Sequence, residues 1–485
     1  MKFFRLPCIT ACLCMPVLAQ QPPPEPLADP IPGRIEKSDI AVALEDFVQL
    51  PRLADSSAAP RTSDAHARIQ YLQPLPDGSG RLAVNDLRGV LYLIDADGGG
   101  PHVFLDMREQ DLAFDDSMFP NETGLLGFAF HPDFGRTGAP GHGRFYTAYS
   151  ATSVSGVADY LEEDSDNHES VIREWIVDDP GANAFSGASR EVFRIGQFAE
   201  NHNIGNLAFN PAAAPGDDDY GMLYVSLGDG GGANDPGEYG QSTSEPLSSI
   251  MRINPLGGSA RYRIPPDNPF VDTDGFAPEI WVWGLRHPQH FSFDNDGTLY
   301  INDIGQTQIE EVNIGVPGAN YGWRLREGTF ATAFGIGGVR PNPVYPRPED
   351  ERAFEYPVAQ YDHDEGRAIG SGYVYRGESI PELRGKYVFA DLVNGRIFHV
   401  ESEGLVNGRI FHVESEGLTP GDPAPIRELR VFIDGEERNI AETLGHPNTY
   451  SSGLRADLRL GIDSEGELYA LTKGDGWVRK IVPGR

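Results

Sequence analysis

The chain has 485 residues, of which 72 are Asp or Glu and 39 are Lys or Arg, so its formal net charge at pH 7 is −33. A surface this acidic repels nucleic acid and anionic membranes, which argues against proteins that bind either through charge. The length allows two or three domains, although large all-β domains also fold as one unit. These numbers suit a soluble exported protein, in which any positive pocket has to be built locally against the overall charge.

The first residues have the pattern of a secretory signal peptide. Two cations precede an apolar run from Leu6 to Leu18, and Ala19 ends a small-residue cleavage site. The run is too short to span a membrane, and a Pro- and Gln-rich stretch follows it. We therefore expect residues 1–19 to be removed, residues 20–39 to form a leader, and the protein to be periplasmic or secreted.

All three cysteines, Cys8, Cys12 and Cys14, lie inside this predicted signal peptide. The processed chain is thus expected to have no disulfide, no thiolate metal site and no haem attached through cysteine. Because residues 9–12 also resemble a lipobox, lipidation at Cys12 is an alternative to simple cleavage after Ala19.

A short pattern recurs along residues 40–485 and predicts their fold. A glycine, one variable residue and a Leu-Tyr or other aromatic pair open a predicted strand six times, at intervals of 54, 78, 76, 88 and 81 residues. Several copies follow a strand and an acidic turn, which is typical of a β-hairpin. Six such units in one chain predict an all-β fold, a six-bladed β-propeller. The six glycines are Gly89, Gly143, Gly221, Gly297, Gly385 and Gly466.

A thirteen-residue segment occurs twice without any change. LVNGRIFHVESEG spans residues 392–404 and again residues 405–417. Such identity is unlike an ancient blade duplication and indicates a recent in-frame duplication or an assembly error in the sequence. We expect one copy to supply a blade strand and the other to add a loop or an extra hairpin, with no functional role.

The chemically active residues of a propeller lie on loops at one mouth of the central channel, so they are scattered along the sequence. His202 stands just before a predicted strand, and Asp229 follows the next one. Together they offer a base and a carboxylate that orients it. Arg286 is a permanent cation suited to gripping a carboxylate or polarising a carbonyl, but a salt bridge between blades explains it equally well.

The segment DIGQTQIEE, residues 303–311, is rich in hard oxygen ligands. Asp303, Glu310 and Glu311 supply carboxylates and the loop supplies backbone carbonyls, which are the donors that Ca²⁺ prefers. A solvated turn without any ligand is the alternative. The local pattern leaves both interpretations open.

Five uncommon strings occur in order along the chain: GLLGFAFHPDF, LYVSLGDGG, GLRHPQHFSFD, EEVNIGVPGANYGW and SGYVYRGESIPELRGKYVFADLVNGRIF. In this order they resemble the soluble glucose/sorbosone dehydrogenases that depend on pyrroloquinoline quinone (PQQ), a family that includes aldose sugar dehydrogenases. The resemblance runs from about Gln70 to the C-terminus and implies a six-bladed propeller, in agreement with the repeat.

The resemblance also implies a role for individual residues. His202 matches the catalytic base of the family, Asp229 the carboxylate that orients it, and Arg286 the arginine that polarises the quinone carbonyl. The remaining matches concern the cofactors: Glu122, Gln289, Arg455 and Arg459 stand at PQQ-binding positions, and the carbonyls of Gly305 and Gln306 at Ca²⁺-binding positions.

The implied reaction is oxidation of an aldose sugar at C1 to its lactone. A base takes the proton of the anomeric hydroxyl while hydride passes to PQQ, and Ca²⁺ and the arginine stabilise the charge on the quinone. Electrons then leave to an external acceptor, a quinone or a cytochrome. The expected partners are a small sugar and this acceptor, with no nucleic acid and no membrane span.

The chain departs from the family pattern at three places. His287 replaces the usual asparagine after the arginine, Val393 or Asn394 stands where glucose dehydrogenases present a lysine to PQQ, and the late arginine pair matches only loosely. Two rival interpretations follow: a non-catalytic propeller module that has lost PQQ, and a Ca²⁺-dependent propeller lactonase. The presence of His202 and its proposed partners favours the enzyme, and the RHPQ string argues against the lactonase.

Overall fold

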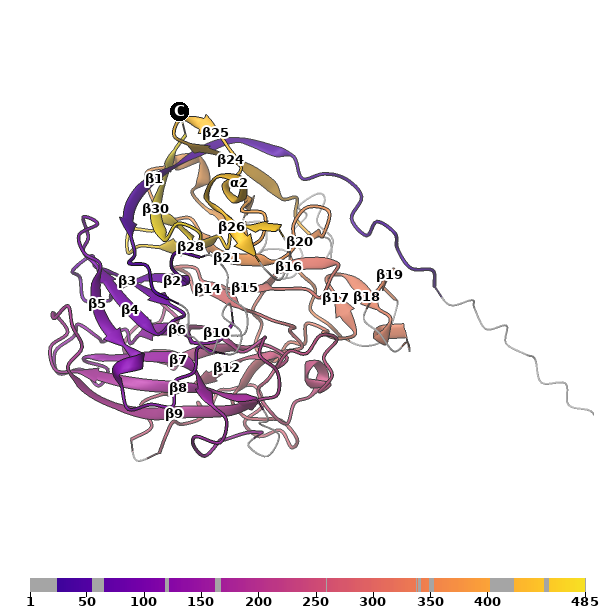
Figure 1. Ribbon diagram of the computed structural model, residues 1–485. Coiled ribbons are helices and arrows are strands. Elements are labelled where there is room, and N and C mark those ends of the chain that lie inside the picture. The colour runs from indigo at the N-terminus through magenta and orange to yellow at the C-terminus, as the bar shows by residue number, and fades with distance from the viewer. Residues whose placement is uncertain are drawn as a thin grey trace, which may run out of the picture.

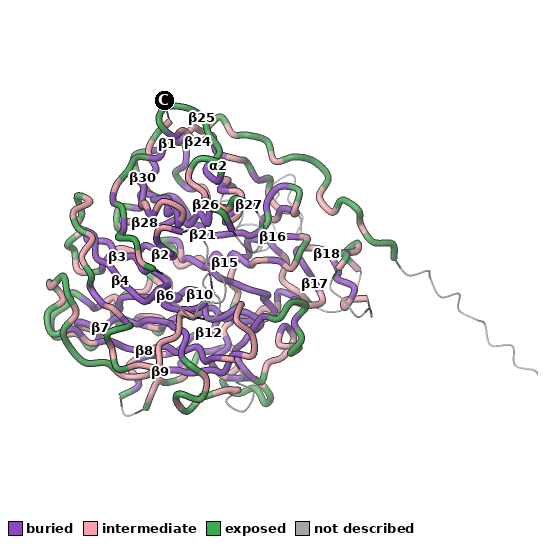
Figure 2. The backbone as a smooth tube through the Cα atoms, in the orientation of Figure 1, coloured by how far each residue is buried: buried purple, intermediate pink, exposed green. Residues whose placement is uncertain are grey.

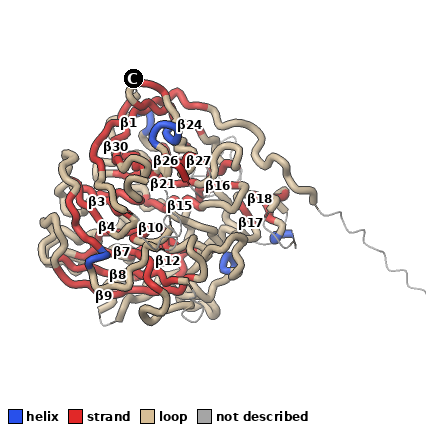
Figure 3. Tube along the Cα trace, in the orientation of Figure 1, coloured by secondary structure: helices blue, strands red, loops and turns tan. Residues whose placement is uncertain are grey.

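The computed structural model describes residues 24–54, 65–117, 122–161, 167–258, 260–336, 338, 342–348, 353–401, 423–448 and 453–484. In these residues strands form almost all of the regular structure (Figures 1 and 3). The helical elements described are α2 (Ile440–Leu444) and four short 3-10 turns, η1 (Met107–Glu109), η2 (Tyr239–Gln241), η3 (Phe334–Ile336) and η4 (Pro381–Leu383). The all-β prediction is confirmed. Within the same ranges, no helix has the length and apolar character needed to cross a membrane.

Four antiparallel sheets of four strands follow one another along the chain. In each sheet the strands pair antiparallel and in chain order, so that each strand lies beside the one before it in the sheet. The first sheet consists of β2 (Ile69–Pro74), β3 (Leu82–Asp86), β4 (Val90–Ile94) and β5 (His102–Asp106), and the second of β6 (Leu125–Phe130), β7 (Arg144–Thr152), β8 (His168–Val177) and β9 (Gly187–Gln197). The third sheet consists of β10 (Ile204–Phe209), β11 (Leu223–Leu227), β12 (Ser249–Ile253) and β13 (Ile280–Trp283). The fourth consists of β14 (His290–Phe293), β15 (Leu299–Asp303), β16 (Ile309–Ile314) and β20 (Ala359–Asp362).

A nine-stranded sheet contains both ends of the described chain. Its order is β21 (Ile369–Val374), β22 (Lys386–Asp391), β23 (Ile397–Glu401), β24 (Arg427–Ile433), β1 (Lys37–Gln49), β30 (Trp477–Pro483), β29 (Leu468–Thr472) and β28 (Arg459–Ile462), with β25 (Glu436–Glu437) on β24. Strand β1 runs parallel to β24 and antiparallel to β30. It therefore joins two hairpin units, and Figure 1 shows it arching over the C-terminal strands.

Two small sheets complete the fold: β17 (Arg326–Glu327), β18 (Phe330–Thr332) and β19 (Val344–Tyr345), and β26 (His446–Asn448) with β27 (Gly453–Arg455).

The first strands of the successive units lie side by side in a closed ring, in the order β2, β6, β10, β14, β21 and β28, with β28 back against β2. Apolar clusters fill the spaces between neighbouring units, so that Leu126 and Tyr146 of the second sheet pack with Val225 and Met251 of the third. Burial follows this arrangement, and exposed residues concentrate in the outer loops (Figure 2). One end of the ring can thus gather residues from every sheet.

The glycine repeat marks equivalent strands in five of its six copies. The last five copies open β7, β11, β15, β22 and β29, each the second strand of its unit. Gly89 instead precedes β4, the third strand of the first sheet, and the second strand there is β3. This shift accounts for part of the shortness of the first interval, 54 residues.

Two sequence predictions concern segments that are only partly described. The predicted signal peptide lies outside the described residues, whereas residues 24–36 are extended and contact the body of the fold: the Leu27 amide donates to the Val344 carbonyl at 2.9 Å. The first copy of the thirteen-residue segment supplies β23, as expected. The second copy, residues 405–417, lies outside the described residues.

Candidate active site

The candidate residues gather at one edge of the sheets. In an antiparallel hairpin the start of the first strand lies beside the end of the second. Accordingly Ile204 pairs with Leu227 in the third sheet, and His290 pairs with Asn302 in the fourth. The residues before the first strands and after the second strands therefore share one mouth of the ring.

His202 and Asp229 form a buried pair at this mouth. The Nδ1 atom of His202 lies 2.6 Å from Oδ1 of Asp229, and both side chains are almost inaccessible to solvent. Burial alone would raise the pKa of Asp229, but the adjacent His202 and Arg286 outweigh it and hold that pKa below its ordinary value. An ionised carboxylate can only accept, so Nδ1 donates and Nε2 carries the lone pair. The imidazole is thereby oriented as a base.

The backbone at His202 is held in an unusual conformation. Its φ is 56°, in the left-handed region that non-glycine residues seldom adopt. The surroundings compensate: the His202 amide donates to Oε2 of Glu122 at 2.7 Å, and the Trp323 indole donates to Oδ2 of Asp229 at 2.9 Å. Such strain is found where side chains are held for function.

His287 stacks on His202 and is neutral. The ring centroids are 4.5 Å apart and the planes differ by 20°. Burial, followed by the proximity of the His202 ring, lowers the pKa of His287 to about 4, although Glu122 opposes the shift with Oε2 only 3.4 Å from Nε2 of His287. His287 thus covers one face of the base without adding a competing charge.

Arg286 is held against the loop that follows β15. Its Nη1 donates to the Gly305 carbonyl at 2.8 Å, and its Nε donates to Oε1 of Gln306 at 3.1 Å. The amide of Arg286 donates to Asp303 at 2.8 Å, and its carbonyl accepts from the amide of Asp229 at 2.9 Å. The guanidinium is therefore fixed between the histidine pair and the predicted Ca²⁺ loop.

Glu327 determines the shape of this loop. Its Oε1 accepts hydrogen bonds from the four consecutive amides of residues 306–309, at 2.8–3.1 Å. At Gly305 an added Cβ would lie 1.8 Å from the Ile309 carbonyl oxygen, so only glycine fits there. Because the amides face Glu327, the loop can present carbonyl oxygens on its other side, where Arg286 lies.

The loop offers few ligands for a metal by itself. Ca²⁺ takes about six to eight oxygens, and no group of three or more His, Asp or Glu side chains suited to a metal occurs in the described ranges. Glu310 instead accepts from His363 at 2.8 Å and from the Ile369 amide at 2.9 Å. The two carbonyls at Gly305 and Gln306 suit Ca²⁺ only when further oxygens come from a bound ligand and water.

Gln289, Arg459 and Arg455 extend the site toward the last sheet. Nη2 of Arg459 donates to Oε1 of Gln289 at 2.7 Å, and Nε2 of Gln289 lies 3.3 Å from Nε2 of His287. Arg455 is ion-paired with Asp457, and Glu122 is among the charges that raise its pKa. The structure thus brings all nine sequence-predicted residues to one mouth.

Three residues of this mouth were missed by sequence reasoning. Trp323 and Glu327 were not assigned a role, because nothing in the sequence reveals that they hold Asp229 and the loop of residues 306–309 from a distance. Lys473 is the third; it follows the last copy of the repeated strand, just as Asp229 closely follows an earlier copy. This shared position after a repeated strand could have identified Lys473 as a candidate from the sequence.

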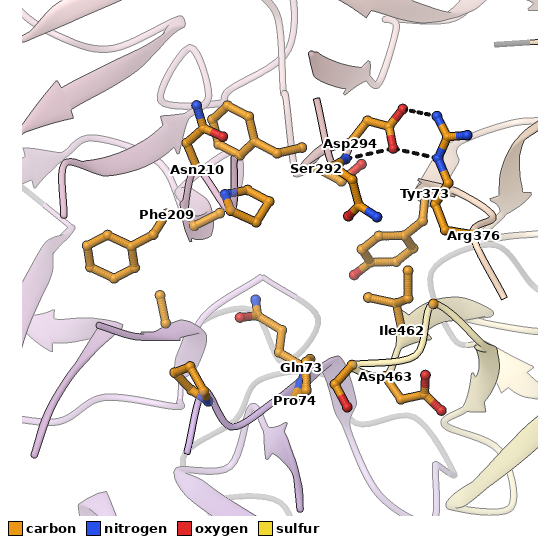
Figure 4. A pocket seen from close by; sticks show the side chains of 18 of the residues that line it. Gln73, Pro74, Phe209, Asn210, Ser292, Asp294, Tyr373, Arg376, Ile462 and Asp463 are labelled. Carbon is orange, nitrogen blue, oxygen red and sulfur yellow. Dashed lines mark hydrogen bonds and ion pairs between the residues drawn. The ribbon is translucent and has the colours of Figure 1, made fainter. Parts of the chain in front are cut away.

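The opposite end of the ring holds a separate cavity of about 420 Å³ (Figure 4). Its lining comes from the far ends of the first strands, including Phe209 and Ile462, and an ion pair between Asp294 and Arg376 spans 2.5 Å at its side. None of the nine candidate residues lines this cavity, so we place the candidate chemistry at the other mouth.

Comparison with known proteins identifies relatives of the chain. The sequence model of the glucose/sorbosone dehydrogenase family matches residues 70–436. HIPL1 protein of Arabidopsis thaliana is 29% identical over 471 residues, which cover 85% of this chain and 61% of that protein. HIPL2 protein of the same plant is covered to 50%, so the chain spans about half to three fifths of these curated relatives.

Solved structures show the same fold at low sequence identity. The soluble aldose sugar dehydrogenase of Escherichia coli, in its apo form, superposes with a TM-score of 0.58 at 19% identity, covering 91% of this chain and 100% of that one. The PQQ-bound form of aldose sugar dehydrogenase from Streptomyces coelicolor gives a TM-score of 0.55 at 20% identity, covering 91% and 98%.

Proposed function

Because this chain belongs to the glucose/sorbosone dehydrogenase family, we propose that it is a PQQ- and Ca²⁺-dependent enzyme that oxidises an aldose sugar at C1 to the lactone. The observation that carries the proposal is the buried His202–Asp229 pair, 2.6 Å between Nδ1 and Oδ1, beside the fixed guanidinium of Arg286. The fold is proposed to be a six-bladed β-propeller, spanning residues 40–485, whose units are the four four-stranded sheets and the two halves of the nine-stranded sheet.

His202 is the proposed general base. Its Nδ1 proton is held by Asp229, so Nε2 is the atom that receives the proton of the anomeric hydroxyl. Asp229 keeps this tautomer and stabilises the imidazolium that forms, as a buried carboxylate does in other His–Asp pairs. His287, neutral and stacked on the ring, excludes water from one face.

The residues around His202 fit an anionic quinone cofactor. Nε and Nη1 of Arg459 are buried and have no hydrogen-bond partner in the described part of the chain, which suits a carboxylate ligand. PQQ, when bound, supplies the two-electron acceptor for the hydride. Arg286, Gln289, Arg455, Arg459 and Glu122 are the residues proposed to hold it.

The metal proposal depends on the cofactor. Gly305 and Gln306 would donate backbone carbonyls to Ca²⁺, and the remaining oxygens would come from the cofactor and water. The carbonyl of Gly305 already accepts from Arg286, but a carbonyl oxygen has a second lone pair. Glu327 holds the loop in the same shape whether the Gly305 carbonyl contacts Arg286 alone or also Ca²⁺.

The physiological setting is also proposed. Electrons pass to an external acceptor, a quinone or a cytochrome, after each sugar is oxidised. Export to the periplasm or the cell exterior follows from the signal-peptide pattern of residues 1–19.

A second candidate function is a binding module that has lost the cofactor. Val393 or Asn394 stands where a cofactor-binding lysine is expected, and Arg286 already donates to the Gly305 carbonyl proposed for the metal. Both observations would follow if the propeller no longer bound PQQ.

Reconstitution separates the two candidates. Purified apo-protein is mixed with PQQ and Ca²⁺, and aldoses are assayed with an artificial dye as acceptor. We expect dye reduction that requires both additions, its loss in His202→Ala, and its retention in His102→Ala, a half-exposed histidine of the first sheet. A PQQ titration with no spectral change and no protection against thermal unfolding would decide for the binding module.

A further inference from the structure

Lys473 has a buried amino group for which the described part of the chain offers no hydrogen-bond partner. It follows β29 at the candidate mouth, its side chain is 1% exposed, and its Nζ makes no hydrogen bond in the described residues. The carbonyl of Lys473 accepts from the His66 amide at 2.8 Å, which fixes its backbone. A buried ammonium without a partner is costly unless a ligand supplies the counter-charge.

The charges around Lys473 leave an excess of positive charge. Asp457 is fully buried, but its two oxygens are already bonded to Arg455 and His446. Arg459 is 3% exposed, and its Nε and Nη1 have no hydrogen-bond partner among the described residues. In a chain of net charge −33, Lys473, Arg455 and Arg459 thus form a cluster of basic residues built locally.

This basic cluster lies beside the loop that lacks the expected lysine. The amide of Ala456 donates to the Val393 carbonyl at 3.1 Å, so this loop is joined directly to the segment that carries Arg455 and Arg459. Leu471, two residues before Lys473, pairs with Arg459 in the hairpin of β28 and β29. Lys473 therefore joins the basic cluster from the strand adjacent to that of Arg459.

We propose that Lys473, together with Arg459, binds carboxylate groups of an organic polycarboxylate, and that Lys473 supplies, from the end of β29, the cation that Val393 or Asn394 does not. Given the proposed function on which this inference rests, the ligand is PQQ. Binding places one carboxylate against Nζ of Lys473 and another against the free edge of the Arg459 guanidinium.

The protonation state of Lys473 gives the proposal a distinctive signature. Burial lowers the pKa of Lys473 to about 7; Asp457 opposes this shift, and Arg459, Arg68 and Arg455 add to it. At pH 8 the free protein therefore holds mostly neutral Lys473. A carboxylate beside Nζ favours the ammonium form, so binding should take up close to one proton per ligand.

The test is calorimetric titration of the full-length apo-protein with PQQ at pH 8, in two buffers of different ionisation enthalpy. We expect the wild type to take up a proton when it binds PQQ. Lys473→Met should bind PQQ roughly ten- to hundred-fold more weakly, because a charge-assisted hydrogen bond is lost, and it should take up no proton. Lys480→Met, a partly exposed lysine of β30, should leave both quantities unchanged. Equal affinity and equal proton uptake in Lys473→Met and wild type would overturn the proposal while leaving the proposed function standing.

A second ligand distinguishes the inference from the proposed function. Benzene-1,2,4-tricarboxylate is titrated in the same way, because it carries the carboxylates without the quinone. Binding of this probe that depends on Lys473, with no binding of PQQ, would support the anion site and refute PQQ as the cofactor. If the wild type binds neither ligand, both proposals are wrong.

Discussion

Replacing Lys473 by methionine should change how stability depends on pH. Burial lowers the pKa of Lys473 from 10.5 to about 7, and each pH unit between these values corresponds to about 1.4 kcal/mol. Between pH 7 and 10.5 the unfolded chain binds the proton and the folded chain does not, so the free energy of unfolding rises with pH. The contribution of Lys473 to the free energy of unfolding is complete above pH 10.5. It decreases as the pH falls from 10.5, and it is lost as the pH falls through 7, a total of about 5 kcal/mol.

The measurable part of this effect lies between pH 7 and 9. There the wild-type apo-protein should gain about 2 kcal/mol from Lys473, and Lys473→Met should lack that gain. Because other groups titrate equally in both proteins, the quantity to follow is the difference between their urea-unfolding free energies. Methionine retains most of the side-chain volume and removes the charge, so the variant should be the more stable protein at pH 7.

The assay is urea unfolding at several pH values, followed by tryptophan fluorescence and circular dichroism. Coincident transitions by the two probes are needed before free energies are compared. Lys480→Met serves as the matched control and should run parallel to the wild type. A difference between Lys473→Met and wild type that stays constant from pH 7 to 9 would mean that the ammonium remains charged in the folded protein, and the argument would fail.

His202→Ala should lower kcat and kcat/KM together by about 10²–10⁴-fold, with PQQ binding retained in a spectral titration, since a base acts in the transition state; retained activity would remove His202 as the base. Arg286→Ala should weaken PQQ binding as well as slow turnover, because its cation also contacts the bound anion; unchanged affinity for PQQ would contradict this. EDTA should abolish activity and Ca²⁺ should restore it, and activity that persists after chelation would rule out the metal. Gly305→Ala should lower the free energy of unfolding by about 1–3 kcal/mol, because its Cβ meets the Ile309 carbonyl; an unchanged thermal midpoint would show that the loop can relax.

The sequence predicted the class of fold better than the details of its units. Repeated hairpins identify strands because the turn and strand signals are local. The copy at Gly89 was placed with the others, although it opens the third strand of its sheet, because a strand's place within a sheet depends on its partners. The pairing of β1 with β24 and β30 joins segments that are far apart in the sequence, so no local sequence pattern predicts it.

The residues of the candidate site also fall into those that the sequence identifies and those that only the structure identifies. His202, Asp229 and Arg286 stand beside strand ends, and Asp229 and Arg286 also belong to recognisable strings, so the sequence was sufficient to select them. The supporting residues Trp323, Glu327 and Lys473 act through contacts with distant segments. Their roles can be assigned only from the structure, in which these distant segments meet at the mouth of the ring.

The position of β1 between β24 and β30 governs when the protein can finish folding. Asp46 of β1 accepts from Nε of Arg479 at 2.7 Å, and these two residues are 433 positions apart. On the ribosome the early sheets can form while the last ones wait for the final segment of the chain. Until then both edges of β1 stay unpaired, and unpaired strand edges invite association with other chains. Ring closure is thus a late step, completed after synthesis, and deletion of β1 or of β30 should prevent it.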